Sequence, residues 1–228
     1  MSDLKKAVEY LTDLTNNNDR EWYHANKERY KQANTEFEHF ISDLIIAIGE
    51  YDNSVLHHTP KNLTFKMVRD TRYSHDKSPY NPTFRAHISS MGKLPIPVGY
   101  YITIAPGNRS FIGGGLFASM FKDATTMIRD YITANGTELE AIVSEKAFAE
   151  HFVVKGEALR NVPKGYDPAH PQADYLKNKS WYLEYPVSNE EVTDGNRFVA
   201  QAALLFSYMK PFNDYLNTAL KEFTMPSR

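Results

Sequence analysis

VGYYITIAPGNRSFIGG, residues 98–114, is the stretch that decides the predicted fold. Its two apolar runs are rich in Tyr, Ile and Phe, which favour strands. Pro106, Gly107 and Asn108 lie between the runs, and this composition is typical of a tight turn. Strands joined by so short a connection pair antiparallel, because a parallel crossover needs about a dozen residues or more. The stretch therefore predicts a β-hairpin in the middle of the chain.

Three further segments extend this hairpin into a sheet. Residues 84–89, FRAHIS, alternate apolar with polar side chains, and residues 180–187, SWYLEYPV, form another strand-like run. The stretch LTFKMVR, residues 63–69, shows the same alternation and is predicted to be a strand as well. We therefore expect an antiparallel sheet formed by the middle of the chain.

Helical patterns flank this region on both sides. Apolar residues recur at helical spacing over residues 4–14, in a long helix that follows to about Gly49, and again over residues 119–135. A terminal helix pair with Pro211 between its members is predicted to end the chain. Helices at both ends of an antiparallel middle indicate an α+β fold. No linker divides the sequence, so residues 1–228 are expected to form a single domain.

Capping signals predict where several helices begin and end. Three residue pairs show the spacing of a capping box: Asn18 with Glu21, Thr137 with Glu140, and Ser188 with Glu191. Gly136 is expected to end the helix before it, because glycine tolerates the left-handed conformation of a helix end.

The composition limits the classes of function. The 228 residues include no cysteine and carry a net charge of −2. Disulfides and cysteine-bound metals are therefore excluded, and nucleic acid is not expected as a partner, because dedicated nucleic-acid binders are usually basic. The histidine and carboxylate spacings match no metal site, so no metal and no cofactor are predicted. The sequence starts without a signal-peptide pattern and has no apolar run of about 18 residues, so we expect a cytoplasmic protein without a membrane partner.

The densest polar segment is VRDTRYSHDKSPYNPTFRAH, residues 68–87. It suits an anion-binding pocket, because the arginine fork matches carboxylate or phosphate and lysine adds a point charge. The structural alternative is that Asp70 and Asp76 bridge to the arginines and only lock a long loop onto the domain. The candidate ligand-binding residues of this segment are Arg69, Arg72, Asp76, Lys77 and Tyr80.

Two later segments supply further candidates. The glycines at 113–115 are predicted to follow a strand and precede a helix, where backbone amides can form an anion nest, although a tight turn with close packing explains them as well. Four more side chains complete the candidate set: Arg129, Lys164, His170 and Lys179. Arg129 lies in an otherwise apolar helix and needs a partner, which a structural aspartate could also provide.

Six pieces of the sequence carry a family resemblance. They are NNNDREWYHANKERY (16–30), VRDTRYSHDKSPY (68–80), GGGLF (113–117), MIRDYI (127–132), VPKGYDPAHP (162–171) and LKNKSW (176–181). In this order, along nearly the whole chain, they resemble the domain-of-unknown-function 2461 family of conserved hypothetical bacterial proteins. The resemblance implies the fold of that family and no particular activity. The chain departs from the family pattern at Tyr73, where the motif often has phenylalanine, and at Asn81, where many relatives have lysine.

Three hypotheses for the function remain open. In the first, the cations of residues 69–80 meet Arg129, Lys164 and His170 across a cleft that binds, and could turn over, a small anionic or phosphorylated ligand. In the second, the same basic loops form an exposed face that binds a protein or a nucleic acid. In the third, the arginines are purely structural. No catalytic residue is assigned.

Overall fold

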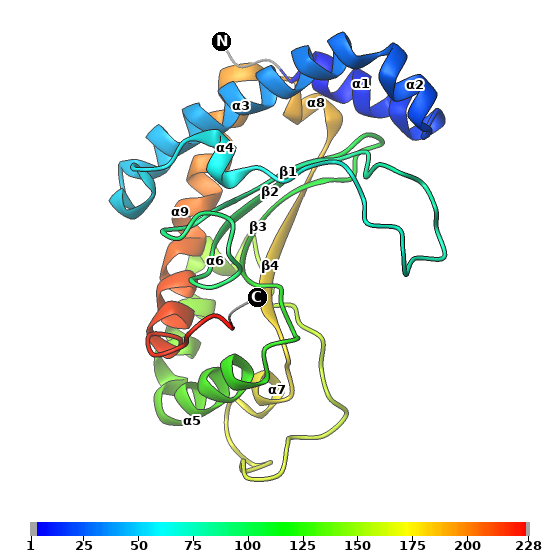
Figure 1. The fold of residues 1–228 in the computed structure, drawn as a ribbon. Coiled ribbons are helices and arrows are strands. Elements are labelled where there is room, and N and C mark those ends of the chain that lie inside the picture. The colour runs from blue at the N-terminus through cyan, green and yellow to red at the C-terminus, as the bar shows by residue number, and fades with distance from the viewer. Residues whose placement is uncertain (1–3, 227–228) are drawn as a thin grey trace.

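The computed structural model describes residues 4–226 as helices arranged around one sheet (Figure 1). A 3-10 turn, Asn53–Val55, lies between α3 and α4. In chain order the helices and strands are α1 (Lys5–Asn16), α2 (Arg20–Ala25), α3 (Lys27–Gly49), α4 (Pro60–Leu63), β1 (Phe84–Ile88), β2 (Gly99–Ile104), β3 (Ser110–Leu116), α5 (Lys122–Ser144), α6 (Lys146–Ala149), α7 (Ala173–Leu176), β4 (Trp181–Val187), α8 (Asn189–Val192) and α9 (Gly195–Ala219).

The strands form an antiparallel sheet in the order β1-β2-β3-β4, so each strand pairs with its neighbour in the chain. The hairpin between β2 and β3 is present, and Gly107 and Asn108 at its turn adopt positive φ values of 73° and 57°. Turns of this kind favour glycine and asparagine because their side chains tolerate the left-handed region. The α+β prediction and the antiparallel middle of the chain are thus confirmed.

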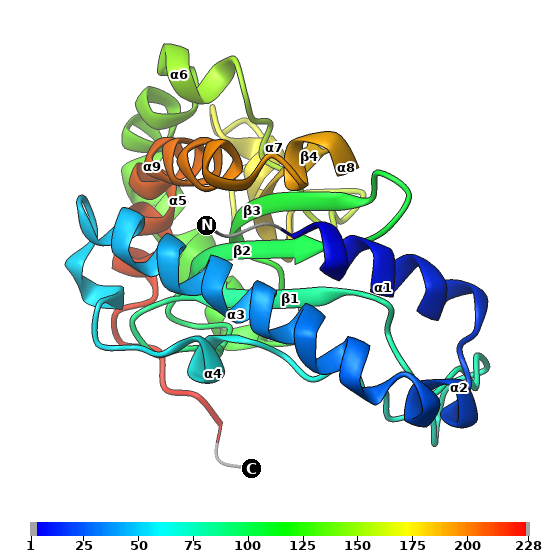
Figure 2. The same cartoon turned by 90° about the horizontal axis from the view of Figure 1, so that it is seen from above.

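Helices cover one face of the sheet. In Figures 1 and 2, α3 and α9 lie along the sheet, α1 packs on α3, and α5 packs against α9. The rings of Phe40 on α3 and Phe198 on α9 stack with centroids 5.2 Å apart, and Ile102, Ile112 and Leu183 of the sheet are fully buried. Each such aliphatic side chain contributes about 1.5–3 kcal/mol to stability through burial. The core therefore lies between the sheet and the α3–α9 layer.

Two amide side chains join α9 to the backbone of the sheet. The buried Asn213 side chain accepts a hydrogen bond from the Gly115 amide at 2.8 Å and donates one to the Gly99 carbonyl at 3.1 Å. The Asn217 side chain bonds in the same way to the amide and the carbonyl of Val98, at 2.8 and 3.0 Å. Without these partners, the backbone groups would be buried unpaired at a cost of about 1–3 kcal/mol each.

The strand predicted over residues 63–69 is wrong. Leu63 ends α4, and the segment after it makes isolated bridges, from Thr64 to Ala86 and from Val68 to Tyr80. The Phe65 amide still donates to the Arg85 carbonyl of β1 at 3.0 Å, but the Arg69 amide donates to the Pro79 carbonyl at 2.9 Å, so the chain leaves the sheet and pairs with the returning loop. Alternation in the sequence could not show which partner the backbone would find.

Two predicted helix boundaries near the N-terminus need correction, and one capping box is confirmed. Asp19, and not Asn18, caps α2, because its carboxylate accepts the Trp22 amide at 2.8 Å. The long N-terminal helix is interrupted at Asn26, which separates α2 from α3. The capping box of Ser188 and Glu191 on α8 is confirmed, since both of its reciprocal hydrogen bonds are present.

The other two corrections concern breaks that turned out to lie inside helices. α5 continues past Gly136 with a kink at Asn135, whose φ of −127° is not helical, so Thr137 opens no new helix. Pro211 lies inside α9 and does not divide a helix pair. The flanking Met209 and Phe212 are fully buried, and their packing holds the helix together where proline removes one hydrogen bond.

The glycines at 113–115 lie inside β3 and not at a strand–helix junction, so the anion-nest prediction is wrong. They are there because neighbours approach closely. A Cβ on Gly114 would lie 3.1 Å from both the Asn213 oxygen and the Met209 sulfur. A Cβ on Gly115, which has a φ of 85°, would lie 2.4 Å from the Trp181 carbonyl oxygen. The packing interpretation of this run is the correct one.

No helix among residues 4–226 is long and apolar enough to cross a membrane.

Candidate functional site

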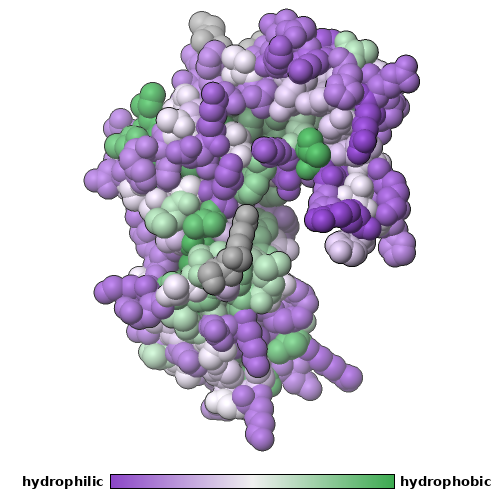
Figure 3. All heavy atoms as spheres, viewed as in Figure 1, coloured by the Kyte–Doolittle hydropathy of each residue, from purple (hydrophilic) through white to green (hydrophobic). Residues whose placement is uncertain are grey.

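The polar segment at residues 68–82, here called the basic arm, projects from one end of the sheet. Figure 1 shows it leaving the body before β1, and in Figure 3 the same region is a mostly hydrophilic extension beside an open hollow. Its base is a short ladder, in which the Arg69 amide donates to Pro79 and the Asn81 amide donates to Met67 at 2.8 Å. The tip is therefore held at both of its ends and forms an ordered loop.

The start of α2 anchors this arm. The Asn18 side chain donates to the Tyr80 carbonyl at 2.9 Å and accepts the Tyr80 amide at 3.2 Å. The ring of Tyr80 stacks on Tyr23 with centroids 4.2 Å apart, and burial raises the pKa of Tyr23 to about 12. Two segments far apart in the sequence are thus joined by backbone hydrogen bonds and by ring packing.

Both arginines of the arm are paired with aspartates. Arg72 binds Asp70 through Nε at 2.9 Å and Nη2 at 2.6 Å, and Arg69 forms an ion pair with Asp76. Hydrogen bonds from Ser78 and then Arg69 hold the pKa of Asp76 well below its usual value, and Arg72 likewise lowers the pKa of Asp70. The structural alternative is therefore correct for these bridges, which fold the tip of the arm.

A pocket of about 630 Å³, here called the basic pocket, opens between the arm and the start of α2. Arg69, Lys77 and Tyr80 line it from the arm, and Arg20 and His24 line it from α2. The Lys77 ammonium donates to the Thr71 carbonyl at 3.0 Å. Within residues 4–226, neither Lys77 nor Arg20 has a carboxylate at ion-pair distance. The two cations are therefore available to a ligand.

Asp19 also lines the basic pocket and limits its positive charge. One oxygen of this carboxylate accepts the Trp22 amide as the cap of α2. The Tyr80 hydroxyl lies within electrostatic reach of both Arg20 and Asp19, and burial, which outweighs the effect of Arg20, raises the pKa of this tyrosine. Tyr80 thus remains a neutral hydrogen-bond donor beside the cations.

The second group of candidates lies at the other end of the sheet. Phe84, where β1 begins, pairs with Ile104, whereas Trp181, where β4 begins, pairs with Leu116 at the opposite end of the strands. The basic arm precedes β1, and the segment of Lys164, His170 and Lys179 precedes β4. Figure 1 shows the two segments apart, the arm to the right of the sheet and the later segment below it. The predicted cleft between them is not formed.

Most side chains of the second group are engaged locally. The Arg129 guanidinium is buried and donates to the carbonyls of Leu176, at 2.9 Å, and Asn178, at 2.7 Å. Lys179 forms an ion pair with Glu157, and His170 accepts the Gln172 amide at 3.0 Å while its other nitrogen lies 3.3 Å from the Thr133 carbonyl. Lys164 is exposed. The partner expected for Arg129 is therefore backbone and not an aspartate.

Sequence reasoning missed the contribution of α2 to the pocket. Arg20 and His24 lie in a piece that carries the family resemblance, but their segment was assigned only to a helix. The contact depends on Asn18 reaching Tyr80, and no spacing rule indicates a contact of that range. Among residues 4–226, no three His, Asp or Glu side chains come together in a way that could hold a metal ion.

Comparison with known families gives one match. The description of the matching family is conserved hypothetical protein (DUF2461), and the match covers residues 6–215. No curated protein and no solved structure matches the chain.

Proposed function

The chain belongs to the family of conserved hypothetical proteins (DUF2461), and from the geometry of its basic pocket we propose that it binds a small anionic, phosphorylated ligand there. One observation carries the proposal: Lys77 and Arg20 come from separate segments, line one pocket and have no carboxylate partner in the described part of the chain. Surface lysines and arginines commonly face open solvent, whereas these two share a concave site.

Each lining residue would make a different contact with a phosphate group. Arg20 can offer a planar fork to two phosphate oxygens, and Lys77 can add a point charge with the N–H groups that Thr71 does not use. The Tyr80 hydroxyl can donate a further hydrogen bond. Arg69 keeps its bond to Asp76 and supplies only part of its positive field. A phosphate group suits this set better than a single carboxylate, because it has more acceptor oxygens.

The backbone around the basic pocket is also held in place by hydrogen bonds within the protein. Asn18 fixes the backbone of Tyr80, and the ladder of Arg69 with Pro79 fixes the start of the arm. A site that is already ordered loses less conformational entropy on binding than a mobile loop would.

Thermal unfolding in the presence of pyrophosphate tests the proposal. At constant ionic strength, millimolar pyrophosphate should raise the Tm of the wild-type protein in a saturable way, because a ligand that binds only the folded state stabilises it. Lys77→Gln and Arg20→Gln should each weaken the apparent affinity about fivefold to tenfold, since a partly exposed charged contact contributes about 1 kcal/mol.

Lys164→Gln is the matched control, because it removes the same charge from an exposed lysine at the other end of the sheet. This variant should bind pyrophosphate like the wild type. Absence of any rise in Tm, or an equal loss of affinity in Lys164→Gln and Lys77→Gln, would contradict a ligand site in the basic pocket.

The tip of the arm supports a second candidate function, an interaction module. Tyr73 is 94% exposed there, and the Arg72 guanidinium lies 5.9 Å from the centroid of its ring. An exposed aromatic side chain beside a cation is a common contact in protein and single-stranded nucleic-acid interfaces. Salt-sensitive retention on single-stranded DNA that Tyr73→Ala abolishes, with no effect of pyrophosphate on Tm, would favour this function.

A further inference from the structure

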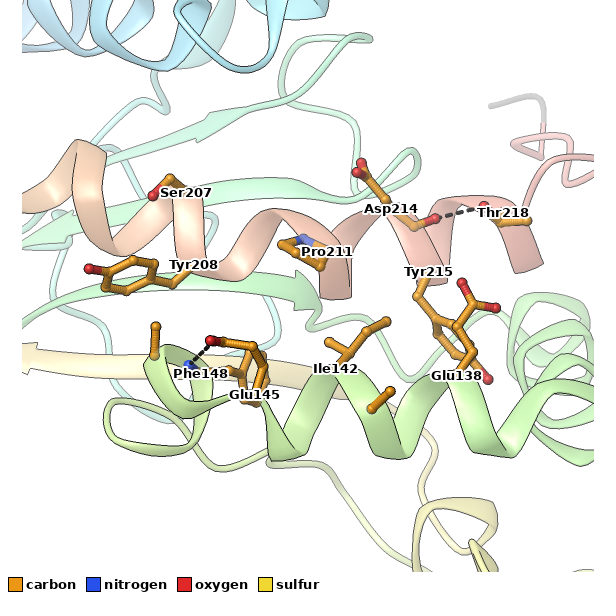
Figure 4. Close-up of a pocket in the computed structure, with 12 residues that line it drawn as sticks. Glu138, Ile142, Glu145, Phe148, Ser207, Tyr208, Pro211, Asp214, Tyr215 and Thr218 are labelled. Carbon is orange, nitrogen blue, oxygen red and sulfur yellow. Dashed lines mark hydrogen bonds between the residues drawn. The ribbon is translucent and has the colours of Figure 1, made fainter.

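A second concave site lies between α5, α6 and the later half of α9, on the side of the molecule away from the basic arm (Figures 1, 2 and 4). Its volume is about 690 Å³, which is within the range of pockets that enclose small organic ligands. We call it the helix groove. It shares no residue with the basic pocket, so its chemistry can be considered separately.

The groove is open because the facing helices present small or rigid side chains along part of their length. Ala141 on α5 and Ala147 on α6 leave space opposite Pro211, whose ring is exposed on α9. Proline has no N–H, so the Ser207 carbonyl one turn earlier lacks its usual helical donor. Ser207 also lines the groove, one helical turn before Pro211.

Aromatic and apolar side chains form the walls. Figure 4 shows Tyr208 and Phe148 near one end, Pro211 and Ile142 facing each other in the middle, and Tyr215 near Glu138 at the other end. Tyr215 is almost fully buried, and burial, with a smaller effect of the nearby Tyr131 and Glu138, raises its pKa far above the usual value. Tyr215 is therefore neutral and closes the floor of this end of the groove, whereas Tyr208 at the other end is half-buried.

The charges at the groove are all negative. Glu138, Glu145 and Asp214 line it, and no lysine or arginine is present among its described lining residues. Asp214 is paired with Lys210, and Glu145 accepts the Phe148 amide at 3.0 Å. Glu138 has only a 3.4 Å hydrogen bond from the Tyr131 hydroxyl. Glu138 is therefore the carboxylate best able to accept a positive charge from a ligand.

We propose that the helix groove binds a small organic cation, an ammonium group carried on an apolar body. The ammonium would pair with the exposed carboxylate of Glu138, and the apolar body would lie along Ile142 and Pro211, whose side chains are at least partly exposed in the groove. An anion of the same shape would be repelled by Glu138 and Glu145, which have no cation beside them among the described residues of the groove. The basic pocket and the helix groove would therefore select ligands of opposite charge.

Three probes of similar size test this assignment: benzyltrimethylammonium, which is a cation, benzyl alcohol, which is neutral, and phenylacetate, which is an anion. Isothermal titration of the wild-type protein should show saturable binding of benzyltrimethylammonium, binding of benzyl alcohol weaker by about tenfold, and no binding of phenylacetate. Absence of benzyltrimethylammonium binding, or equal binding of the cation and the anion, would overturn the proposal.

Two variants locate the binding within the groove. Glu138→Gln keeps the shape of an exposed side chain and should weaken benzyltrimethylammonium binding about fivefold to tenfold. Ala141→Trp should fill the groove and abolish binding of both the cation and benzyl alcohol. The control is Glu9→Gln, which removes an exposed carboxylate from α1 and should bind like the wild type. Far-UV circular dichroism and the Tm without ligand establish that each variant folds, and a loss of affinity in Glu9→Gln equal to that in Glu138→Gln would also overturn the proposal.

Discussion

The segments that precede β1 and β4 look alike in sequence, yet the structure uses their polar residues differently. Both are irregular, and both combine lysine, tyrosine and proline within a few residues. Before β1, Lys77 and the neighbouring Arg20 have no carboxylate partner in the described chain and share a pocket. Before β4, Lys179 is paired with Glu157, and Arg129 of α5 donates to the carbonyls of Leu176 and Asn178.

The difference follows from which backbone groups each segment leaves unpaired. At the start of β4, carbonyls face the core side of α5 and need donors, so a buried arginine has a structural role there. In the basic arm the chain closes on itself through a ladder, and the carbonyls of Tyr80 and Thr71 accept hydrogen bonds from Asn18 and Lys77. Lys77 therefore keeps two of its three N–H donors for a ligand, whereas Arg129 is buried against two backbone carbonyls.

The largest effect is expected from Arg129→Met. This substitution keeps an apolar stem but removes both donors from buried carbonyls, which should lower the free energy of unfolding by about 3 kcal/mol in urea denaturation. Pyrophosphate affinity of the folded variant should not change. Arg197→Met, which removes an exposed arginine paired only with Asp194, should stay within about 0.5 kcal/mol of the wild type. A stable Arg129→Met protein would break the comparison between the two ends.

A smaller effect is expected from Asn18→Ala, which cuts the anchor of the basic arm. Loss of two hydrogen bonds to the Tyr80 backbone should lower the free energy of unfolding by about 1–2 kcal/mol and also weaken pyrophosphate binding. Urea denaturation and thermal shifts measure the two quantities. Asn16→Ala, two residues earlier at the exposed end of α1, should change neither. If Asn18→Ala lowers stability but leaves binding intact, the arm does not need its anchor to hold a ligand.

The smallest effect concerns the tip of the arm at low pH. The folded-state pKa of Asp76 is below its unfolded value of about 3.9, so the stabilisation from its hydrogen bonds is complete above that pH and is lost as the pH falls through the folded pKa. The amide shift of Ser78, which donates to Asp76 at 2.9 Å, should therefore stay constant from pH 7 to about 4 in an NMR titration. Below about pH 4 the Ser78 amide shift should change as Asp76 becomes protonated, and in Asp76→Asn this change should be absent. A midpoint at or above the ordinary aspartate value would show that the arm is not ordered by this carboxylate.

The sequence predicted the sheet well because its signals are local. Alternation, turn residues and short gaps were enough to predict the segments of β1 to β4 and an antiparallel sheet, but not the pairing of β4 with β3, which are far apart in the chain. Prediction failed where a distant partner decided the outcome. Residues 63–69 alternate like a strand, but after one contact with β1 at Thr64 and Phe65 they pair with the loop at 79–81. Pro211 looks like a helix break but is held inside α9 by buried neighbours.

The candidate site was predictable only in part, for the same reason. Arg69, Lys77 and Tyr80 of the arm were identified by residue type and do line a pocket. Arg20 was missed, because its place depends on the contact between Asn18 and Tyr80. Arg129 and Lys179 had the right residue type but lie at the far end of the sheet, and only the strand order shows this. The acidic helix groove gave no sequence signal, since its carboxylates look like an ordinary solvated helix face.

The amides of Asn213 and Asn217 give α9 a fixed position along its own axis. Apolar side chains can interlock in more than one way, so a helix held only by them could slide by a turn and still bury similar area. Each asparagine finds its donor and acceptor at a single place on the strands, and a displacement of about 5.4 Å would leave both pairs of backbone groups buried and unsatisfied. Apolar core residues on α9 should therefore tolerate exchange during divergence far better than these two amides, even though the amides contribute little buried hydrocarbon.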